Sequence, residues 1–453
     1  MTRRVYLARW VLPIVSPPIA DGAVAVDGER IAWVGPATDA PEGLVHDLGD
    51  SILLPGLVNV HTHLELTAMR GFLEELSFRR WVVHLTKARE AAMTPERSMA
   101  AARAGIAEGL LAGITTFGDV SDTGRSLEAM RDMGVRGMTW LEVFGPSPSQ
   151  CAESLAGLRA RVESLGPRAT NLVRLGVSPH APYSVSDDLF RATAQYALDE
   201  SLPVTVHIAE SREEWDLVVE GQGEFADGLR SRGIAVAPRG SSPVAMLETL
   251  GVLRTRPLLV HAVRVTPADQ QRIADTGSAV AHCPASNAKL GHGVAPLMAI
   301  LERGIRVGLG TDSVASSNRM CLLDEGRLAV FQQRAATQRF DALGGTAMVE
   351  MATMGSARTL GLEGRIGSLE VGKDADLAAF PIDPVRDTPV FAPEDALIFG
   401  AAGRRAALVT VAGRELIRDG RLLADIRHDL ALLEEAGTAL RVAAPAPVAS
   451  PSH

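Results

Sequence analysis

The pattern of hydrophobic and polar positions divides the chain into a central region and two flanking regions. Between about residues 55 and 360, short apolar runs alternate with longer amphipathic stretches, which is typical of strands followed by helices. Strands are expected at eight runs, 52–60, 113–120, 135–144, 172–179, 203–208, 257–262, 278–283 and 305–311. Residues 95–112 are rich in Ala and follow Thr94, which predicts a helix with a Thr N-cap and Pro95 at its first position.

Eight strand–helix units in sequence favour a closed parallel barrel over an open doubly wound sheet. No glycine-rich dinucleotide motif follows the first run, which also disfavours the open sheet. Both ends of the chain instead alternate apolar and polar residues over short distances, with turns such as Asp27-Gly28, and predict a small antiparallel β unit. We therefore expect an α/β fold in which a TIM-like (β/α)8 barrel carries a small β-sandwich domain built from both termini.

The expected domain boundaries follow from these patterns. The barrel takes residues 55–360, and the small β domain takes residues 1–54 plus 361–425. Residues 426–453 begin with a helix at about 429–440. They end in a tail of Ala, Pro and Ser that we expect to be disordered, because it has nothing to bury.

Composition narrows the class of protein. Hydrophobic residues make up 46% and charged residues 22% of the chain, as in ordinary globular enzymes. The net charge of -9 without a Lys/Arg block gives no indication of nucleic acid or an anionic membrane as a partner. No apolar run reaches the roughly 20 residues of a membrane span, and we identify no signal peptide. Three cysteines without a Cys-x-x-Cys motif indicate neither disulfides nor a thiolate zinc site, so a cytoplasmic location is expected.

Polar residues occur where the apolar runs end, and in a parallel barrel all strands end at the same mouth. The first run ends in His61 and His63, whose spacing of two residues directs both to one side of a strand. The later runs lead to His180, His207 with Glu210, His261, His282 with Asn287, and Asp312. A single histidine of this kind is more often structural, but their common position favours a metal site. Three imidazoles and a carboxylate suit Zn²⁺, Fe²⁺ or Mn²⁺ and leave room for a water molecule.

Four motifs connect these residues with a known family. They are Pro-Gly-Leu-Val-Asn-Val-His-Thr-His at 55–63, His-Ile-Ala-Glu at 207–210, His-Cys-Pro-Ala-Ser-Asn at 282–287 and Gly-Thr-Asp-Ser at 310–313. With these motifs in this order, the chain resembles the amidohydrolase superfamily, in its cytosine-deaminase-like branch of chlorohydrolases and nucleoside deaminases. The resemblance covers nearly the whole chain, including residues 364–377.

The resemblance implies one divalent metal ion, with Zn²⁺ first and Fe²⁺ or Mn²⁺ as alternatives. Its ligands would be His61, His63, His207 and Asp312. No lysine stands at the end of the fourth run, where two-metal relatives carry one, so a single ion is implied. In such enzymes Asp312 would also take a proton from the water, and His261 would steady the attacking oxygen. Glu210 would protonate a ring nitrogen, after which the amino group leaves as ammonia.

Several residues allow two interpretations. Glu210 either carries this proton or is an acidic residue favoured at a helix N-terminus. His180 matches a position that contacts substrate in related deaminases, or it is a buried turn histidine. Trp81 either stacks on a heterocycle or packs an amphipathic helix. Asn287 either lines the pocket or satisfies loop backbone. Glu65 resembles a residue of aminodeoxyfutalosine deaminases.

The expected function is deamination of an amino-substituted nitrogen heterocycle. Purine-type nucleoside derivatives such as aminodeoxyfutalosine or S-adenosylhomocysteine come first. Arg79 is a departure, because adenosine-type members often carry an acidic residue for ribose hydroxyls at about this position. A hydrolytic dechlorinase with the same site is an alternative, and a non-catalytic barrel that binds a metal or ligand is another. Members of the family are often dimers or tetramers, so a homo-oligomer with a small-molecule substrate is expected.

Overall fold

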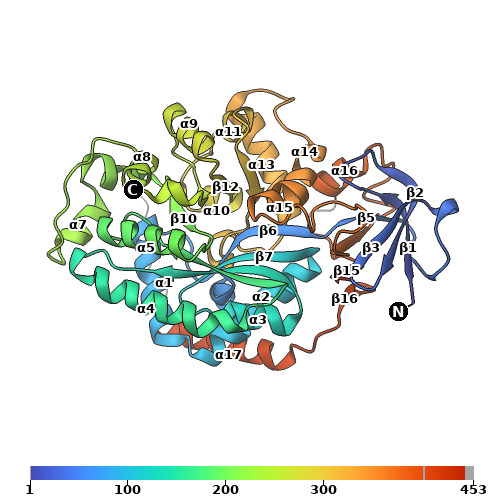
Figure 1. Ribbon diagram of the computed structural model, residues 1–453, viewed down its shortest axis with the longest axis horizontal. Coiled ribbons are helices and arrows are strands. Elements are labelled where there is room, and N and C mark those ends of the chain that lie inside the picture. The colour runs from blue at the N-terminus through green and yellow to red at the C-terminus, as the bar shows by residue number, and fades with distance from the viewer. Residues whose placement is uncertain (1, 401–402, 444–453) are drawn as a thin grey trace.

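The computed structural model describes residues 2–400 and 403–443 of the chain. The expected disordered tail lies, from residue 444 on, outside the described residues. Figure 1 shows the strands of both terminal regions together at one end, beside the helices and parallel strands of the central region. Within the described part of the chain, no helix combines the length and the apolar character that crossing a membrane would need.

All eight expected strand runs form strands, and they build two four-stranded parallel sheets. The first sheet has the order β6 (Leu57–Thr62), β7 (Ile114–Ser121), β8 (Arg136–Val143), β9 (Val173–Pro179). The second has the order β10 (Thr205–Ile208), β11 (Leu258–His261), β12 (Ala279–His282), β13 (Arg306–Leu309). Parallel bridges between Val177 and Val204 and between Thr62 and Asp312 connect the edges of the two sheets.

The interior of the central region is a buried apolar cluster to which both sheets contribute. Its members include Val58 and Val60 of β6, Met138 and Trp140 of β8, Leu258 and Val260 of β11, and Ala279 and Ala281 of β12. Alternate residues of these strands, such as Leu141 and Leu259, belong instead to the larger cluster under the helices. This period of two is what a strand with both faces covered produces.

The expected first run, 52–60, is interrupted at Gly56 and serves two sheets. Residues before the glycine form β5 (Ser51–Pro55), which pairs with β1 and β14. Residues after it form β6 of the parallel sheet. A side chain at Gly56 would collide with that of Thr115, so the crossing needs a residue without Cβ.

Strands from both termini form one nine-stranded sheet. Its strands are β1 (Arg4–Val11), β2 (Ile19–Asp27), β3 (Arg30–Pro36), β4 (Leu44–Asp47), β5, β14 (Leu377–Pro381), β15 (Leu408–Val411), β16 (Arg414–Arg418) and β17 (Arg421–Leu422). The expectation of an antiparallel unit was wrong for β4 and β5, which run parallel to β1. The three strands β1, β2 and β3 form an antiparallel meander. The chain then returns to the other edge of β1, where β4 and β5 pair with it.

Helices cover the parallel strands. They are α1 (Phe78–Ala92), α2 (Pro95–Leu111), α3 (Arg125–Met133), α4 (Cys151–Leu165), α5 (Asp187–Asp199), α6 (Arg212–Trp215), α7 (Glu224–Arg230), α8 (Pro243–Thr249), α9 (Pro267–Thr276), α10 (Pro284–Lys289), α11 (Leu297–Glu302), α12 (Val314–Ser317), α13 (Leu322–Thr337), α14 (Gly345–Glu350), α15 (Ser356–Thr359), α16 (Pro393–Asp395) and α17 (Arg427–Ala443). The Thr94 side chain caps α2 by accepting from the Arg97 N–H, as expected.

The expected C-terminal helix is α17, which is three residues longer at its end than the pattern indicated. It returns to the central region and packs on α2 and α1, below α2 in the view of Figure 1. A hydrogen bond of 3.0 Å from Arg103 Nε to Asp429 Oδ2 fixes this contact.

Candidate metal centre

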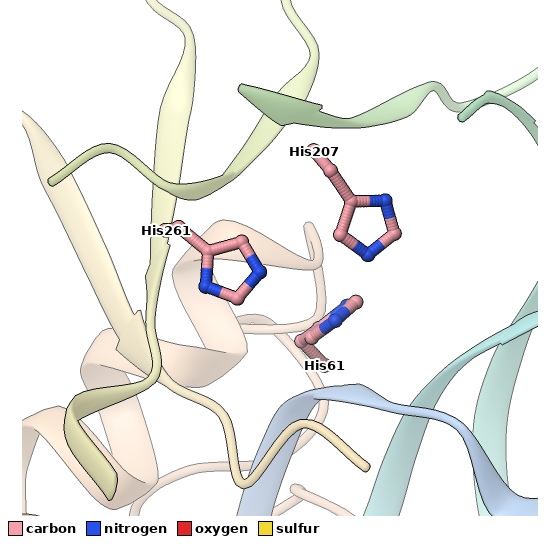
Figure 2. A group of neighbouring side chains, drawn as sticks. All are labelled: His61, His207 and His261. Atoms are coloured by element: carbon pink, nitrogen blue, oxygen red, sulfur yellow. The ribbon is translucent and has the colours of Figure 1, made fainter. Parts of the chain in front are cut away.

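Histidines from the ends of three parallel strands point at one another. Figure 2 shows His61, His207 and His261 reaching from separate strands toward a common space. One nitrogen of each ring lies within 4.8 Å of the others, and the same holds for His61, His63 and an oxygen of Asp312. Residues separated by about 250 positions in the sequence thus meet where the strands end.

The distances within this group match the ligands of one small cation. His63 Nε2 lies 3.3 Å from His207 Nε2. Asp312 Oδ1 lies 3.2 Å from His61 Nε2 and 3.5 Å from His63 Nε2. Ligands at about 2.0–2.1 Å from a tetrahedral zinc ion are roughly 3.3 Å apart. These three distances are those expected between neighbouring corners of such a coordination shell.

The imidazoles present lone pairs to this space. His207 Nδ1 donates to the carbonyl oxygen of His180 at 3.2 Å, so Nε2 of the neutral ring is free to bind a cation. Burial, together with the neighbouring histidine His61, lowers the pKa of His63 to about 3. The pKa of His207 is also held well below its ordinary value, first by burial and then by the surrounding histidines. Neutral imidazole is the form that metal ions bind.

Asp312 divides its two oxygens between two tasks. Oδ2 accepts hydrogen bonds from Ser286 Oγ at 2.6 Å and from Ser316 Oγ at 2.9 Å. Oδ1 faces the imidazoles. Burial would raise the pKa of this carboxyl, but the adjacent imidazole of His61 holds that pKa well below the ordinary value. The group is therefore an ionised carboxylate with one oxygen directed at the histidines.

A buried glutamate holds the turn that carries Glu210. Glu214 accepts the backbone N–H of Ala209 at 2.8 Å and that of Glu210 at 2.9 Å. Ser211 caps the short helix that follows. Ala209 has a left-handed φ of 52°, a strained conformation for a residue with a side chain. The two hydrogen bonds stabilise this turn and keep Glu210 at the end of β10.

The carboxylate of Glu210 points at histidines and not at a helix terminus. Its Oε1 lies 3.3 Å from His261 Nε2 and 3.3 Å from His292 Nε2. Burial would raise the pKa of Glu210, but His261 and His292 hold it below the ordinary value. His261 Nδ1 donates to Asn287 Oδ1 at 2.9 Å, which fixes the orientation of its ring. His261 itself has a left-handed φ of 75°.

The structure gives the remaining sequence-predicted residues different surroundings. The ring centroid of His180 lies 4.9 Å from that of His207. Trp81 is 7% exposed and belongs to a buried apolar cluster with Phe78 and Phe225. Glu65 accepts hydrogen bonds from Thr123 at 2.7 and 2.8 Å and from Ser121. His180 and Asn287 therefore contact the cluster of histidines. Glu65 is instead hydrogen-bonded to serine and threonine side chains, and Trp81 packs among apolar residues.

Two residues of the site were missed by the sequence analysis. His292 follows no strand, yet it is buried against Glu210 and packs edge-to-face on Phe78 with ring centroids 4.6 Å apart. Glu142 is the last polar residue of β8, and one of its oxygens lies within 4.8 Å of nitrogens of His180 and His207. No sequence signal pointed to His292, but the strand-end rule would have found Glu142.

Comparison with protein families matches residues 52–416 to the amidohydrolase family. A relative from Syntrophobacter fumaroxidans, named 5-methylthioadenosine/S-adenosylhomocysteine deaminase, is 33% identical over 409 residues, which is 89% of this chain and 89% of the relative.

Solved structures share the fold of this chain. An adenosine deaminase from Xanthomonas campestris with bound zinc superposes with a TM-score of 0.85 at 28% identity, over 97% of this chain and 98% of that one. An atrazine chlorohydrolase from Arthrobacter aurescens complexed with zinc gives a TM-score of 0.83 at 28% identity, over 96% and 100% of the two chains.

Proposed function

The chain belongs to the amidohydrolase family, and from this premise we propose that it is a metal-dependent deaminase of an amino-substituted nitrogen heterocycle. The observation that carries the proposal is the convergence of three imidazoles and one carboxylate beside a second carboxylate, Glu210. The relatives named above act, by their names, on adenosine-type nucleosides or on a triazine. A purine-type nucleoside derivative, such as S-adenosylhomocysteine or aminodeoxyfutalosine, is the preferred substrate class.

We assign one divalent ion, with zinc first, to His61, His63, His207 and Asp312. The spacing of their ligand atoms, and zinc in two related structures, support this assignment. An ion at this place would lower the pKa of a bound water from about 15.7 to roughly 7. Fe²⁺ and Mn²⁺ suit the same donor set, and metal analysis of the purified protein separates the three.

The protein's own side chains then move the protons. Asp312 would take a proton from the attacking water, and His261, protonated at both nitrogens, would donate a hydrogen bond from Nε2 to the oxygen of that water. Glu210 in its protonated form would give a proton to the ring nitrogen next to the reacting carbon, and Asp312 would pass the proton taken from the water to the amino group, which leaves as ammonia. The 3.3 Å contact between Glu210 Oε1 and His261 Nε2 supports placing both groups beside the same reacting atoms.

We also propose a finer architecture. The edge bridges and the shared apolar cluster support a closed (β/α)8 barrel over residues 55–360. The nine-stranded sheet would be a small β-sandwich domain of residues 1–54 plus 361–425, with the C-terminal helix and tail at 426–453. A cytoplasmic location fits three cysteines without disulfide partners. A homo-oligomer, either dimer or tetramer, remains part of the proposal, and sedimentation analysis tests it.

The second candidate function is hydrolytic dechlorination, which the similarity to the chlorohydrolase favours. The two functions use the same site and differ in the leaving group. Metal-loaded protein should therefore be screened for ammonia release from adenosine-type nucleosides and other aminopurines, and for chloride release from chlorotriazines. A barrel that only binds a metal or ligand would release neither product.

The Glu210→Gln variant tests the proton transfer. We expect its turnover of the best substrate to fall by about 10²- to 10⁴-fold, because the ring nitrogen loses its proton donor. Glu213→Gln, at a partly exposed position in the next turn, is the matched control and should keep full activity. Unchanged turnover in Glu210→Gln would show that the assignment of the proton carrier is wrong.

A further inference from the structure

The short helix α10 holds two of the three side chains to which the proposed function gives a part in the reaction. Ser286 Oγ donates to Asp312 Oδ2 at 2.6 Å. Asn287 Oδ1 accepts from His261 Nδ1 at 2.9 Å. Because both contacts come from neighbouring residues of one helix, the orientations of the aspartate and of the imidazole are set together.

The third side chain, Glu210, meets a histidine from the loop that follows α10. His292 stands between Gly291 and Gly293, which both have a left-handed φ. Its backbone N–H donates to the carbonyl oxygen of Asn287 at 2.9 Å. Its ring is buried, and Nε2 lies 3.3 Å from Glu210 Oε1. The tight turn that the glycines permit therefore brings the imidazole back beside the carboxyl group.

The rest of the protein leaves Nε2 of His292 unsatisfied. This nitrogen is buried and has no aligned hydrogen-bond partner in the described part of the chain, although Glu210 Oε1 is within hydrogen-bond distance. Burying an unpaired ring nitrogen is unfavourable. Hydrogen bonds of active sites are often long or poorly aligned until a substrate is bound. A small rotation of either side chain is enough to align this pair.

Packing alone does not account for a histidine at this position. The ring of His292 meets Phe78, the first residue of α1, edge-to-face with centroids 4.6 Å apart. Phe78 also packs on Tyr183 and Phe225. A phenylalanine in place of the histidine would make the apolar contacts without burying a polar nitrogen. The imidazole is therefore explained by its contact with Glu210.

The contacts of Glu210 distinguish its two oxygens. His261 and His292 both approach Oε1. When the carboxyl group carries its proton on Oε2, Oε1 still has lone pairs and can accept from the Nε2–H of His292. The same N–H stabilises the negative charge that develops as the proton leaves Oε2. A donor at Oε1 thus serves a group that gives its proton from Oε2.

We propose that His292 is a positioning residue for the proton donor: its Nε2–H donates to Glu210 Oε1, directs Oε2 toward the substrate and stabilises the carboxylate as the proton leaves. The inference rests on the proposed function, because it takes Glu210 to be the group that gives the proton. No covalent bond to His292 forms or breaks, and its own proton stays on Nε2. The loop after α10 thereby does for Glu210 what the helix does for Asp312 and His261.

Two substitutions separate this role from packing. His292→Phe keeps a ring against Phe78 and removes the donor, whereas His292→Gln loses the ring and keeps an N–H donor. Metal-loaded protein is assayed with 5′-methylthioadenosine, or with the compound of the ammonia-release screen that is turned over fastest. We expect kcat to fall by about 10- to 100-fold in His292→Phe with little change in KM, because the hydrogen bond acts as the proton leaves. His292→Gln should stay within about threefold of the wild type. The opposite order of the two variants would refute the proposal.

A double-mutant cycle shows whether His292 acts through Glu210. In the Glu210→Gln background, His292→Phe should lower the remaining kcat by less than about twofold, since the proton donor is already gone. An equal fold loss in both backgrounds would refute a role through Glu210. Val294→Ala, on the same loop at a position that is 41% exposed, is the control and should keep full activity. All variants are compared at equal zinc content, so that loss of the ion is not mistaken for loss of the hydrogen bond.

A second measurement decides the inference even if no compound releases ammonia and the proposed function fails. In zinc-loaded protein labelled with nitrogen-15 at histidine, the Nε2–H of His292 is the ring signal that disappears in His292→Gln. Its chemical shift should change in Glu210→Gln, because a carboxylate is a stronger acceptor than an amide oxygen. A changed shift without ammonia release would support the contact and reject the deaminase. An unchanged shift would refute the contact whatever the activity.

Discussion

The two ends of strand β8 carry buried ionisable side chains in opposite situations. At its start, Arg136 donates to Asp376 at 2.8 and 3.0 Å and to Asp374 at 2.8 Å. Arg365 binds Asp374 as well. At its end, Glu142 has no hydrogen bond from the described residues to its buried oxygen. The same strand therefore carries a paired charge at one end of the parallel sheets and, at the other, a carboxyl group whose pKa burial raises well above its ordinary value.

The residues at the start of β8 stabilise the fold, whereas the residues at its end belong to the candidate metal centre. The ion network at Arg136 connects β8 with the segment before β14 and so joins the parallel strands to the terminal sheet. At the opposite end lie the cluster of histidines, unpaired polar atoms, and left-handed φ angles at Ala209, His261 and Asp312. Strain and unpaired groups of this kind persist where ligands bind. Substitutions at the start of β8 should accordingly lower the free energy of unfolding, whereas changes at the metal centre should lower activity.

Removing the metal should have the largest effect, and only on activity at first. Dialysis of the protein against a chelator should reduce ammonia release by at least about a thousandfold, because the water is then no longer activated. Added Zn²⁺ should restore the rate, whereas Mg²⁺ should not, since nitrogen ligands suit it poorly. Full activity in protein that metal analysis shows to be metal-free would contradict the proposed site.

Breaking the network at the start of β8 should instead reduce stability. Arg136→Met leaves two buried carboxylates without their central partner, and we expect the free energy of unfolding to fall by about 3–5 kcal/mol. Urea unfolding of the metal-free protein measures this. The kcat of the protein that remains folded should stay near the wild-type value, because Arg136 lies at the start of β8 and no residue at the C-terminal ends of the parallel strands is altered.

Arg30→Met is the matched control for Arg136→Met. Arg30 pairs with Asp374 at 2.6 Å, but its side chain is 51% exposed. Solvent screens such a pair, and its loss should cost less than about 1 kcal/mol. Equal destabilisation by the two substitutions would mean that burial does not decide the strength of this network.

The strands and most residues of the candidate metal centre could be predicted from the sequence, because two signals in it coincide. Apolar runs of strand length recur between amphipathic stretches, and polar residues stand directly after them. In a parallel sheet this places His61, His207, His261 and Asp312 at one end, where the structure has them. Glu142 obeys the same rule at the end of the 135–144 run, although the sequence analysis assigned no site residue to that run.

Other features depend on backbone geometry that periodicity does not encode. Along β11, Leu258 and Val260 point into the interior cluster, so strict alternation would turn His261 away. Its φ of 75° breaks the alternation. His292 arrives on a loop between glycines with left-handed φ, Gly291 and Gly293. The split at Gly56 reflects close approach to Thr115, a tertiary contact that the sequence pattern of the 52–60 run cannot reveal.

The smallest expected effect is a change in how the free energy of unfolding depends on pH, caused by the buried His282. Burial lowers the pKa of His282 to about 4, below the unfolded value of about 6.5. As pH falls from 6.5 to 4, the unfolded chain binds a proton that the folded chain does not, so stability falls across this window and is unaffected above it. Metal-free His282→Gln should lose about 1–3 kcal/mol less than the wild type between pH 7 and pH 4 in urea unfolding.

His84→Gln, at a partly exposed position of α1, is the control for this pH dependence and should follow the wild type at every pH. The variants must be compared without metal, because an ion released by acid adds its own loss of stability. If His282→Gln and the wild type lose stability in parallel, then His282 does not contribute to the acid sensitivity. Arg136 stays charged at these pH values, so its own side chain does not contribute to this difference.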